Sequence, residues 1–192
     1  CSDKIKLDTD NFICEDKNMV KNYVLDTNLL LDNPNVIYGF QDNNVYITGV
    51  TLQELDNHKN DRGEVGYNTR EVGRILDELR KHYGRLKTGV PLKSGGTLHL
   101  LSPHIENSLL PAWMDSEKPD NRIIEACMWL KEKERTVRTI LLSNDTYLRI
   151  NADNCGIETE SVWNDRVLDS NYTGHRFVNI QDQSIIDALH DK

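Results

Sequence analysis

The chain of 192 residues contains no long hydrophobic run and no segment typical of export. No window approaches the roughly 18 uninterrupted apolar residues that a membrane-spanning helix needs. A basic stretch followed by an apolar core, the pattern of a secretion signal, is also missing from this sequence. We therefore expect a soluble, cytoplasmic protein that has no membrane partner.

Cysteine is scarce, and no two cysteines stand at metal-binding spacing: the four residues are Cys1, Cys14, Cys127 and Cys155. Without a C-x-x-C pair, neither a disulfide framework nor a zinc site is expected, and reduced thiols fit a cytosolic protein. Cys127 falls in the apolar stripe of a predicted helix, so we expect it to be a small buried hydrophobic residue.

Several catalytic motifs are absent as well. None of the six histidines belongs to an H-E-x-x-H motif, and no G-x-x-x-x-G-K-[ST] phosphate loop occurs. No internal repeat or low-complexity tract is present. No zinc site of the H-E-x-x-H type is therefore expected, and no ATPase activity is assigned to these residues.

The net charge of −8 at first argues against a nucleic-acid partner. The charge is unevenly distributed, however. Residues 59–93 hold nine Lys or Arg against five Asp or Glu, so this segment is +4 and the remainder is −12. The sequence thus combines a basic arm with an acidic body.

Hydrophobic periodicity predicts strands that alternate with helices. The expected strands are 22–26, 44–48, 97–102, 136–142 and 157–161, and the expected helices begin at residues 27, 50, 63, 119 and about 146. The strand at 136–142 is continuously apolar, as in a parallel sheet covered on both faces. The predicted fold class is a three-layer α/β/α domain with a mostly parallel central sheet.

The helix predicted over 63–84 is amphipathic. Its apolar face contains Val72, Ile75, Leu76, Leu79 and Tyr83, and its opposite face carries Arg70, Arg74, Lys81 and Arg85. The basic face fits an RNA backbone and equally an ordinary solvated helix face with acidic partners. Among the tryptophans, Trp113 is kept as a weak candidate for RNA contact, whereas Trp129 is expected to be structural.

Four acidic residues stand where predicted strands end or where helices begin: Asp26, Glu54, Asp120 and Asp145. Ligands of open parallel sheets bind beyond the carboxyl ends of the strands, so these residues are candidates for one site. Taken singly, each has an ordinary explanation. The three aspartates are typical helix caps or first-turn residues, and Glu54 is typical of a helix surface.

Taken together, four carboxylates would repel one another unless cations neutralise them or they bind protons. Oxygen-only ligands favour Mg²⁺ or Mn²⁺ over zinc. Acidic metal clusters serve phosphoryl transfer, in which one ion activates water and another stabilises the leaving oxygen.

The blocks that carry these acids resemble the PIN-domain ribonucleases, and in particular the N-terminal PIN domain of PhoH-like proteins. The similarity lies in "LDTNLLLDNPN", "ELDNHKNDRGEVGYNTREVGRILDELR" and "SNDTYLRINADNCGI", and it extends from about Met19 to Gly174. The resemblance implies a Rossmann-like PIN domain over residues 19–175. Residues 1–18 would be a leader or a peripheral segment. Residues 176–192 would be a tail or the start of a linker to a PhoH-like ATPase domain.

The resemblance also implies an activity: metal-dependent endonuclease cleavage of single-stranded RNA. Asp26, Glu54, Asp120 and Asp145 would bind Mg²⁺ or Mn²⁺, and Thr27, Asn28 and Ser143 would help to orient them. Homo-oligomers are expected by the same resemblance. Two rivals stay open, a non-catalytic PIN scaffold that binds RNA or a partner, and an aspartyl phosphatase. The phosphatase is disfavoured because Asn28 stands where a second aspartate would be required.

Overall fold

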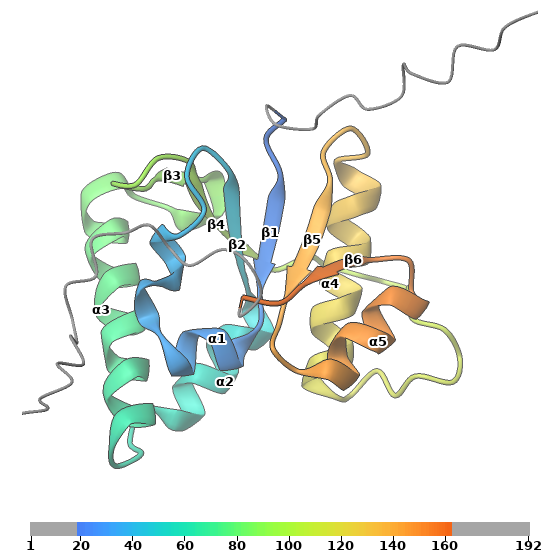
Figure 1. The fold of residues 1–192 in the computed structure, drawn as a ribbon, viewed down its shortest axis with the longest axis horizontal. Coiled ribbons are helices and arrows are strands. Elements are labelled where there is room, and N and C mark those ends of the chain that lie inside the picture. Colours follow the sequence, from blue (N-terminus) through green and yellow to red (C-terminus); the bar gives the residue numbers. More distant parts are fainter. Residues whose placement is uncertain (1–18, 163–192) are drawn as a thin grey trace, which may run out of the picture.

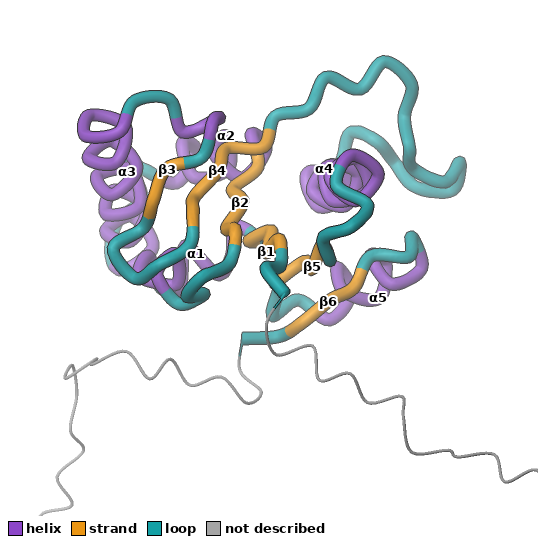
Figure 2. Tube along the Cα trace, turned by 90° about the horizontal axis from the view of Figure 1, so that it is seen from above, coloured by secondary structure: helices purple, strands orange, loops and turns teal. Residues whose placement is uncertain are grey.

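The computed structural model describes residues 19–162, which form one twisted sheet between two layers of helices (Figures 1 and 2). The strands are β1 (Asn22–Leu25), β2 (Asn44–Thr48), β3 (Val90–Pro91), β4 (Thr97–Leu101), β5 (Thr139–Leu142) and β6 (Glu158–Glu160). The α-helices are α1 (Thr27–Asp32), α2 (Gly49–His58), α3 (Glu64–Tyr83), α4 (Pro119–Lys133) and α5 (Thr146–Asn154). Short 3₁₀ helices lie at Pro34–Tyr38 and Leu86–Thr88.

The strand order is β3-β4-β2-β1-β5-β6, and every neighbouring pair is parallel except β3 with β4. The chain builds outward from β1 through β2 to β4, then crosses to β5 on the other side of β1. The order of the strands therefore reverses between β1 and β5. In parallel sheets, this switch point leaves a crevice at the carboxyl ends of the strands, where ligands bind.

Side chains alternate between the two faces of the sheet and so create two cores. Tyr23 and Leu25 of β1 point to the cluster formed with α1, α2 and α3, whereas Val24 points to the cluster formed with α4 and α5. β5 shows the same division, with Ile140 and Leu142 on one side and Leu141 on the other. The expected three-layer α/β/α class with a mostly parallel sheet is confirmed.

The largest differences from the sequence prediction lie at element ends. The strand predicted from residue 136 begins at Thr139, because the chain first turns after α4, with the Val137 amide donating to the Glu134 carbonyl oxygen over 2.9 Å. Strand β3 and both 3₁₀ helices were not predicted. Tyr83, expected on the apolar face of α3, is half exposed because it lies in the last turn of that helix.

Cys127 is fully buried in the α4–α5 core, as predicted, and Trp129 packs against the same core. Within residues 19–162, no helix is long and apolar enough to cross a membrane. The predictions for residues 1–18, for 163–175 at the end of the domain, and for the tail at 176–192 concern residues outside the described range.

Candidate active site at the β1–β5 switch point

Asp26 occupies the switch point directly. It follows β1, and its amide donates to the carbonyl oxygen of Leu142 at the end of β5 over 3.0 Å. The residue precedes α1 in the N-cap position, yet its side chain makes no capping hydrogen bond. Instead, Oδ2 of Asp26 accepts a hydrogen bond of 2.7 Å from Oγ of Ser143, and the aspartate is only 1% exposed. Capping therefore does not explain this buried carboxylate.

Burial raises the pKa of the Asp26 carboxyl from 3.8 to about 6. Hydrogen bonds from Ser143 and from the Thr27 backbone oppose this rise, while the negative charges of Asp120 and Glu54 add to it. The fold thus holds a carboxylate in a place where its charged form is costly. The Coulombic effect of two other predicted acids also puts them in the electrostatic neighbourhood of Asp26.

Glu54 reaches this neighbourhood from α2. The helix begins after β2 with a capped first turn, in which the Thr51 amide donates to Oγ1 of Thr48 over 3.0 Å. One helical turn further on, a carboxylate oxygen of Glu54 accepts a hydrogen bond from the buried hydroxyl of Thr27. Thr27 therefore orients the Glu54 side chain, and its role in supporting a metal site stays a prediction.

Asp120 lies in the first turn of α4, after Pro119. Partial burial raises the pKa of its carboxyl group, the negative charge of Asp145 raises it further, and Lys118 lowers it. Asp120 is thus coupled to both Asp26 and Asp145.

Asp145 is a true helix cap. Its Oδ1 accepts hydrogen bonds from the amides of Tyr147 and Leu148, over 2.7 and 3.1 Å, at the start of α5. Its own amide donates to Oγ of Ser143 over 3.0 Å, so one serine hydroxyl connects Asp26 with Asp145. Oδ2 of Asp145 accepts no hydrogen bond from residues 19–162.

The donor chemistry of this set fits a hard divalent cation. All four side chains offer carboxylate oxygens, and no lysine or arginine within residues 19–162 forms an ion pair with any of them. In the same part of the chain, no three His, Cys, Asp or Glu side chains lie close enough together to hold a metal ion. The acids therefore share one electrostatic neighbourhood without forming an assembled coordination shell.

Asn28 and Trp113 make no hydrogen bond with any of the four acids within residues 19–162. Asn28 is exposed in α1, and its side chain makes no hydrogen bond with another described residue. Trp113 is 64% exposed in the loop that precedes α4.

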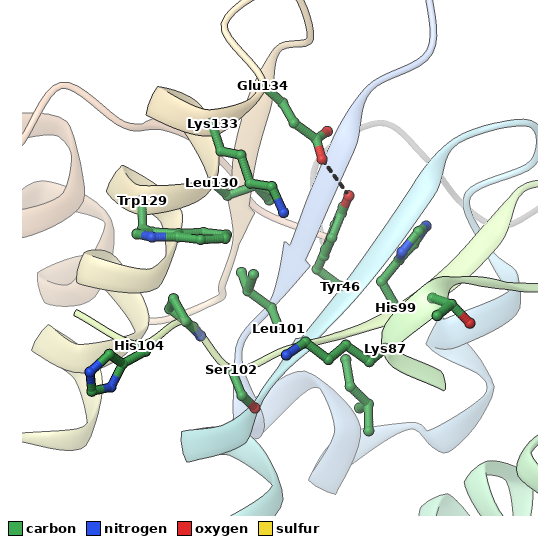
Figure 3. Close-up of a pocket in the computed structure, with 13 residues that line it drawn as sticks. Tyr46, Lys87, His99, Leu101, Ser102, His104, Trp129, Leu130, Lys133 and Glu134 are labelled. Carbon is green, nitrogen blue, oxygen red and sulfur yellow. Dashed lines mark hydrogen bonds between the residues drawn. The ribbon is translucent and has the colours of Figure 1, made fainter. Parts of the chain in front are cut away.

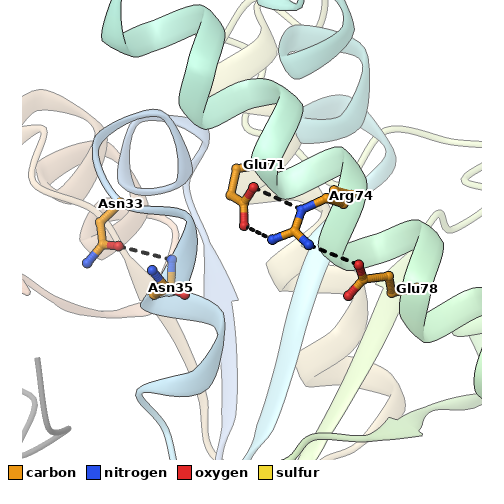
Figure 4. Close-up of polar contacts among 5 residues, drawn as sticks. All are labelled: Asn33, Asn35, Glu71, Arg74 and Glu78. Atoms are coloured by element: carbon orange, nitrogen blue, oxygen red, sulfur yellow. Dashed lines mark hydrogen bonds and ion pairs between the residues drawn. The ribbon is translucent and has the colours of Figure 1, made fainter.

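The basic face of α3 is largely neutralised by its own helix. Arg74 forms ion pairs with Glu71 and, over 3.0 Å, with Glu78 (Figure 4). Lys81 pairs with Asp77 over 2.6 Å, and Arg70 donates to the backbone oxygen of Lys59. Arg85 is exposed just beyond the helix. These partners match the solvated-face alternative, and an RNA contact here stays a prediction.

Two positioning residues were missed by the sequence analysis. Thr48 caps α2 and so helps to set the direction of the helix that carries Glu54. The signal in the sequence was a threonine at the end of an apolar strand, directly before a predicted helix. The side-chain nitrogen Nδ2 of Asn68 on α3 donates to the backbone carbonyl oxygens of Leu31 and Asp32, which anchors the end of α1. No local pattern marks Asn68, because its partners lie 36 and 37 residues away.

The domain is a six-stranded, mostly parallel α/β sheet with a buried aspartate at its switch point, and Glu54 and Asp120 lie in the electrostatic neighbourhood of that aspartate. The family model described as "PIN domain" matches residues 23–163 of this chain. The chain belongs to the PIN-domain family.

Three curated proteins that are similar to this chain share one name. The chain is 40% identical over 171 residues to "Protein PhoH2" of Bacillus subtilis. It is 33% identical to the protein of the same name from Thermobispora bispora and 32% identical to that from Mycolicibacterium smegmatis. Each match covers 86% of this chain but only 37–38% of the relative, so the chain spans less than two fifths of those proteins.

The buried charge of Asp26 gives a prediction for stability. The folded-state pKa of about 6 lies above the ordinary 3.8, so between these values the folded state binds the proton more tightly than the unfolded state. As the pH rises through this window, the metal-free protein should lose about 3 kcal/mol of stability through this one group. In urea unfolding with EDTA, the free energy of unfolding of Asp26→Asn relative to wild type should therefore rise by about this amount between about pH 4 and pH 7.

Asp56→Asn, on the exposed face of α2, is the matched control for removing one negative charge. If the difference between Asp26→Asn and wild type stays constant over the same pH range, then Asp26 is not a strained buried carboxylate.

Proposed function

We propose that this PIN domain is a metal-dependent endoribonuclease that hydrolyses phosphodiester bonds of single-stranded RNA with Mg²⁺ or Mn²⁺. The observation that carries the proposal is Asp26, a buried carboxylate at the switch point of the sheet with a raised pKa and no cation partner within residues 19–162. A fold retains such a group at a cost, and metal binding is the use that best offsets that cost.

In this proposal, Asp26, Asp120 and Asp145 hold the metal ions, and Glu54 ligates an ion or positions the attacking water. When bound, the ions would supply an activated water nucleophile and stabilise the leaving oxygen. Oxygen-rich sites of this kind suit both Mg²⁺ and Mn²⁺.

The protein's own contribution is orientation. The Ser143 hydroxyl donates to Asp26 and accepts from the amide of Asp145, so the ends of β1 and β5 keep a fixed spacing. The Thr27 hydroxyl directs Glu54 toward the same place. Because Asp26 is almost fully buried, its charge acts in a poorly screened environment, which strengthens its attraction for a cation.

The defining experiment incubates the 192-residue chain with a labelled single-stranded RNA, in Mn²⁺ and in EDTA. Internal cuts that require Mn²⁺ are expected, and EDTA should reduce the cleavage rate by at least ~10³-fold, since metal ions supply several kcal/mol of transition-state stabilisation. RNA that stays intact in Mn²⁺ and in Mg²⁺ would contradict the proposal.

The second candidate is a non-catalytic PIN scaffold that binds RNA or a partner. It is favoured by two observations: Asp145 already caps α5, and no three metal-binding side chains within the described part of the chain lie within reach of one ion. The span of less than two fifths of the PhoH2 relatives fits a domain that serves a larger protein. We propose that a PhoH-like ATPase domain follows this domain in the larger protein. We also propose that the larger protein is cytoplasmic and forms homo-oligomers.

Thr27 gives a test that is specific for positioning. Thr27→Val removes the hydroxyl that holds Glu54 but keeps the shape of the side chain, so kcat for RNA cleavage should fall about tenfold while KM changes little. Thr27→Ser keeps the hydroxyl and should restore most of kcat. Steady-state kinetics on a labelled RNA substrate measure both parameters.

Thr69→Val is the matched control, since the Thr69 hydroxyl donates to the Val65 carbonyl oxygen within α3 and to no other residue between 19 and 162. If Thr27→Val cleaves RNA with the kcat of wild type, the proposed positioning role of Thr27 is contradicted.

A further inference from the structure

Two cavities lie on the same side of α4, outside the acidic cluster. The first has a volume of about 480 Å³ and lies between the sheet residues Tyr46 and His99 and the α4 residues Trp129 and Lys133 (Figure 3). The second has a volume of about 370 Å³ and lies between the start of α2 and the first half of α4. Residues 101–104, which leave the end of β4, line both cavities.

A single stripe of α4 joins these cavities into one groove. Arg122 and Ala126 line the second cavity, and Trp129 and Lys133 line the first. The spacing of these residues, i, i+4, i+7 and i+11, places them in one row along the helix. At 1.5 Å per residue, the row is about 16 Å long. We name this feature, between the row and residues 101–104, the α4 groove.

The cations of the α4 groove are not neutralised by neighbouring acids. Lys87, Arg122 and Lys133 form no ion pair with any residue between 19 and 162. In Figure 3, the ammonium groups of Lys87 and Lys133 lie between the sheet and α4. This differs from the basic face of α3, where Arg74 and Lys81 are already paired.

The acids of the groove are instead engaged by neutral donors. Glu125 accepts hydrogen bonds from the Ser108 hydroxyl and the Leu109 amide, over 2.7 and 2.9 Å. Glu134 accepts from the side-chain amide of Asn22 over 2.8 Å. Both carboxylates keep their charge, but neither forms an ion pair with Lys87, Arg122 or Lys133, so within residues 19–162 no acid occupies the donors of these three cations.

An aromatic side chain supplies a flat surface beside these cations. Trp129 is half-buried, lines the cavity, and has the Lys133 ammonium 4.8 Å from its ring centroid. Tyr46 and His99 stack with centroids 4.7 Å apart in the sheet wall, but Tyr46 is only 5% exposed, so the stacking surface is assigned to Trp129. Cations beside an accessible aromatic ring in an open groove are features that bind single-stranded nucleic acid.

One end of the groove lies near the proposed catalytic acids. Gln53 and Arg122 line the second cavity, and they stand one residue from Glu54 on α2 and two residues from Asp120 on α4. A strand in the groove would therefore be led toward the carboxyl edge of the sheet.

We propose that the α4 groove binds single-stranded RNA, with Lys87, Arg122 and Lys133 contacting phosphates and Trp129 stacking on a base. The identity of the ligand rests on the proposed nuclease function, and the groove gives the path of the strand into that site.

The test measures binding of a labelled single-stranded oligouridylate to the full 192-residue chain in EDTA, where metal-dependent hydrolysis is blocked. Lys133→Ala and Arg122→Ala should each weaken binding and lower the slope of log K against log salt by about 0.7, the value for one lost phosphate contact on a single strand. Arg135→Ala is the matched control, since Arg135 follows the same helix and already pairs with Glu132; it should keep the wild-type slope.

Trp129→Leu tests the stacking contact separately. It should weaken binding about tenfold without changing the salt slope, because a base contact carries no counterion release. A melting curve for this variant checks that the partly buried position still folds, and the two charge variants test the groove independently of that result.

Wild-type salt slopes for both Lys133→Ala and Arg122→Ala would overturn the inference, as would a slope lowered by Arg74→Ala instead, since this would assign the RNA to α3. Failure to bind the oligouridylate at all would also overturn it. Metal-dependent cleavage by the wild-type chain is measured in parallel. If the wild-type chain cleaves RNA but the groove variants keep the wild-type salt slope, only the groove proposal is contradicted. If the groove variants lower the slope but the wild-type chain does not cleave RNA, only the nuclease proposal is contradicted.

Discussion

Asp26→Asn is expected to abolish RNA cleavage and to leave the fold at least as stable as wild type at pH 7. Asparagine has the same shape and can still accept the hydrogen bond from Ser143, but it removes the negative charge that would attract the metal ions. A loss of at least ~10³-fold in the cleavage rate should follow, because several kcal/mol of transition-state stabilisation depend on those ions. The cleavage rate and the melting temperature are measured on the same preparations.

The stability measurement makes this result specific. Burial raises the pKa of Asp26 to about 6, so at pH 7 the wild-type protein carries a strained charge that the variant lacks. A variant that loses activity and also melts well below wild type would be inactive for a structural reason. Retained cleavage in a folded Asp26→Asn protein would contradict the catalytic role outright. Asp56→Asn, which removes one exposed charge from α2, should cleave like wild type.

Mn²⁺ is expected to stabilise the wild-type chain strongly. A ligand that binds only the folded state, present at about 100 times its dissociation constant, adds about 2.7 kcal/mol to the free energy of unfolding. For a chain of this size, this gain corresponds to a rise in melting temperature of roughly 5–10 °C. Differential scanning fluorimetry with increasing Mn²⁺, and again after addition of EDTA, measures the effect and its reversal.

Asp26→Asn serves as the control for Mn²⁺ bound elsewhere on this acidic protein. The variant should show little or no rise, since Asp26 is the central proposed ligand. Equal rises in both proteins would place the stabilising metal outside the switch point. No rise in either protein would favour the non-catalytic scaffold over the nuclease.

Much of the fold could be predicted because most of its strands are short runs rich in apolar residues. The run over Thr139–Leu142 predicted a strand covered on both faces, and its residues do divide between the two cores. The strand order was beyond reach, since no local pattern shows that β1 lies between β2 and β5. The ends of elements could not be predicted where residues that favour a strand lie in a turn instead, as Val137 does.

The acidic residues could be named from the sequence, but the physical state of each could not. Asp26 and Asp145 both precede helices, and both fit the pattern of a cap. Only Asp145 caps its helix, whereas Asp26 turns to Ser143, which is 117 residues away along the chain. That contact depends on the pairing of β1 with β5, so the sequence could not distinguish a cap from a buried candidate ligand.

For RNA binding, the sequence pointed to basic residues on α3, whereas the structure points to the α4 groove. The basic residues of α3 were visible in the sequence, and so were the acids three and four positions away that pair with them, such as Glu71 and Glu78 around Arg74. That spacing favours the solvated face, the alternative that was kept open beside the RNA contact. The α4 groove combines residues from β2, β4, α4 and the 3₁₀ helix Leu86–Thr88, so its unpaired cations become visible only in three dimensions.

The central claim is that the carboxylates at the switch point bind divalent metal. Its most direct test is a crystal structure of the wild-type chain with Mn²⁺, examined by anomalous scattering. The account predicts a manganese peak in contact with a carboxylate oxygen of Asp26 and with at least one of Asp120 and Asp145. Crystals in saturating Mn²⁺ with no peak at Asp26, or with peaks only at other acids, would contradict it.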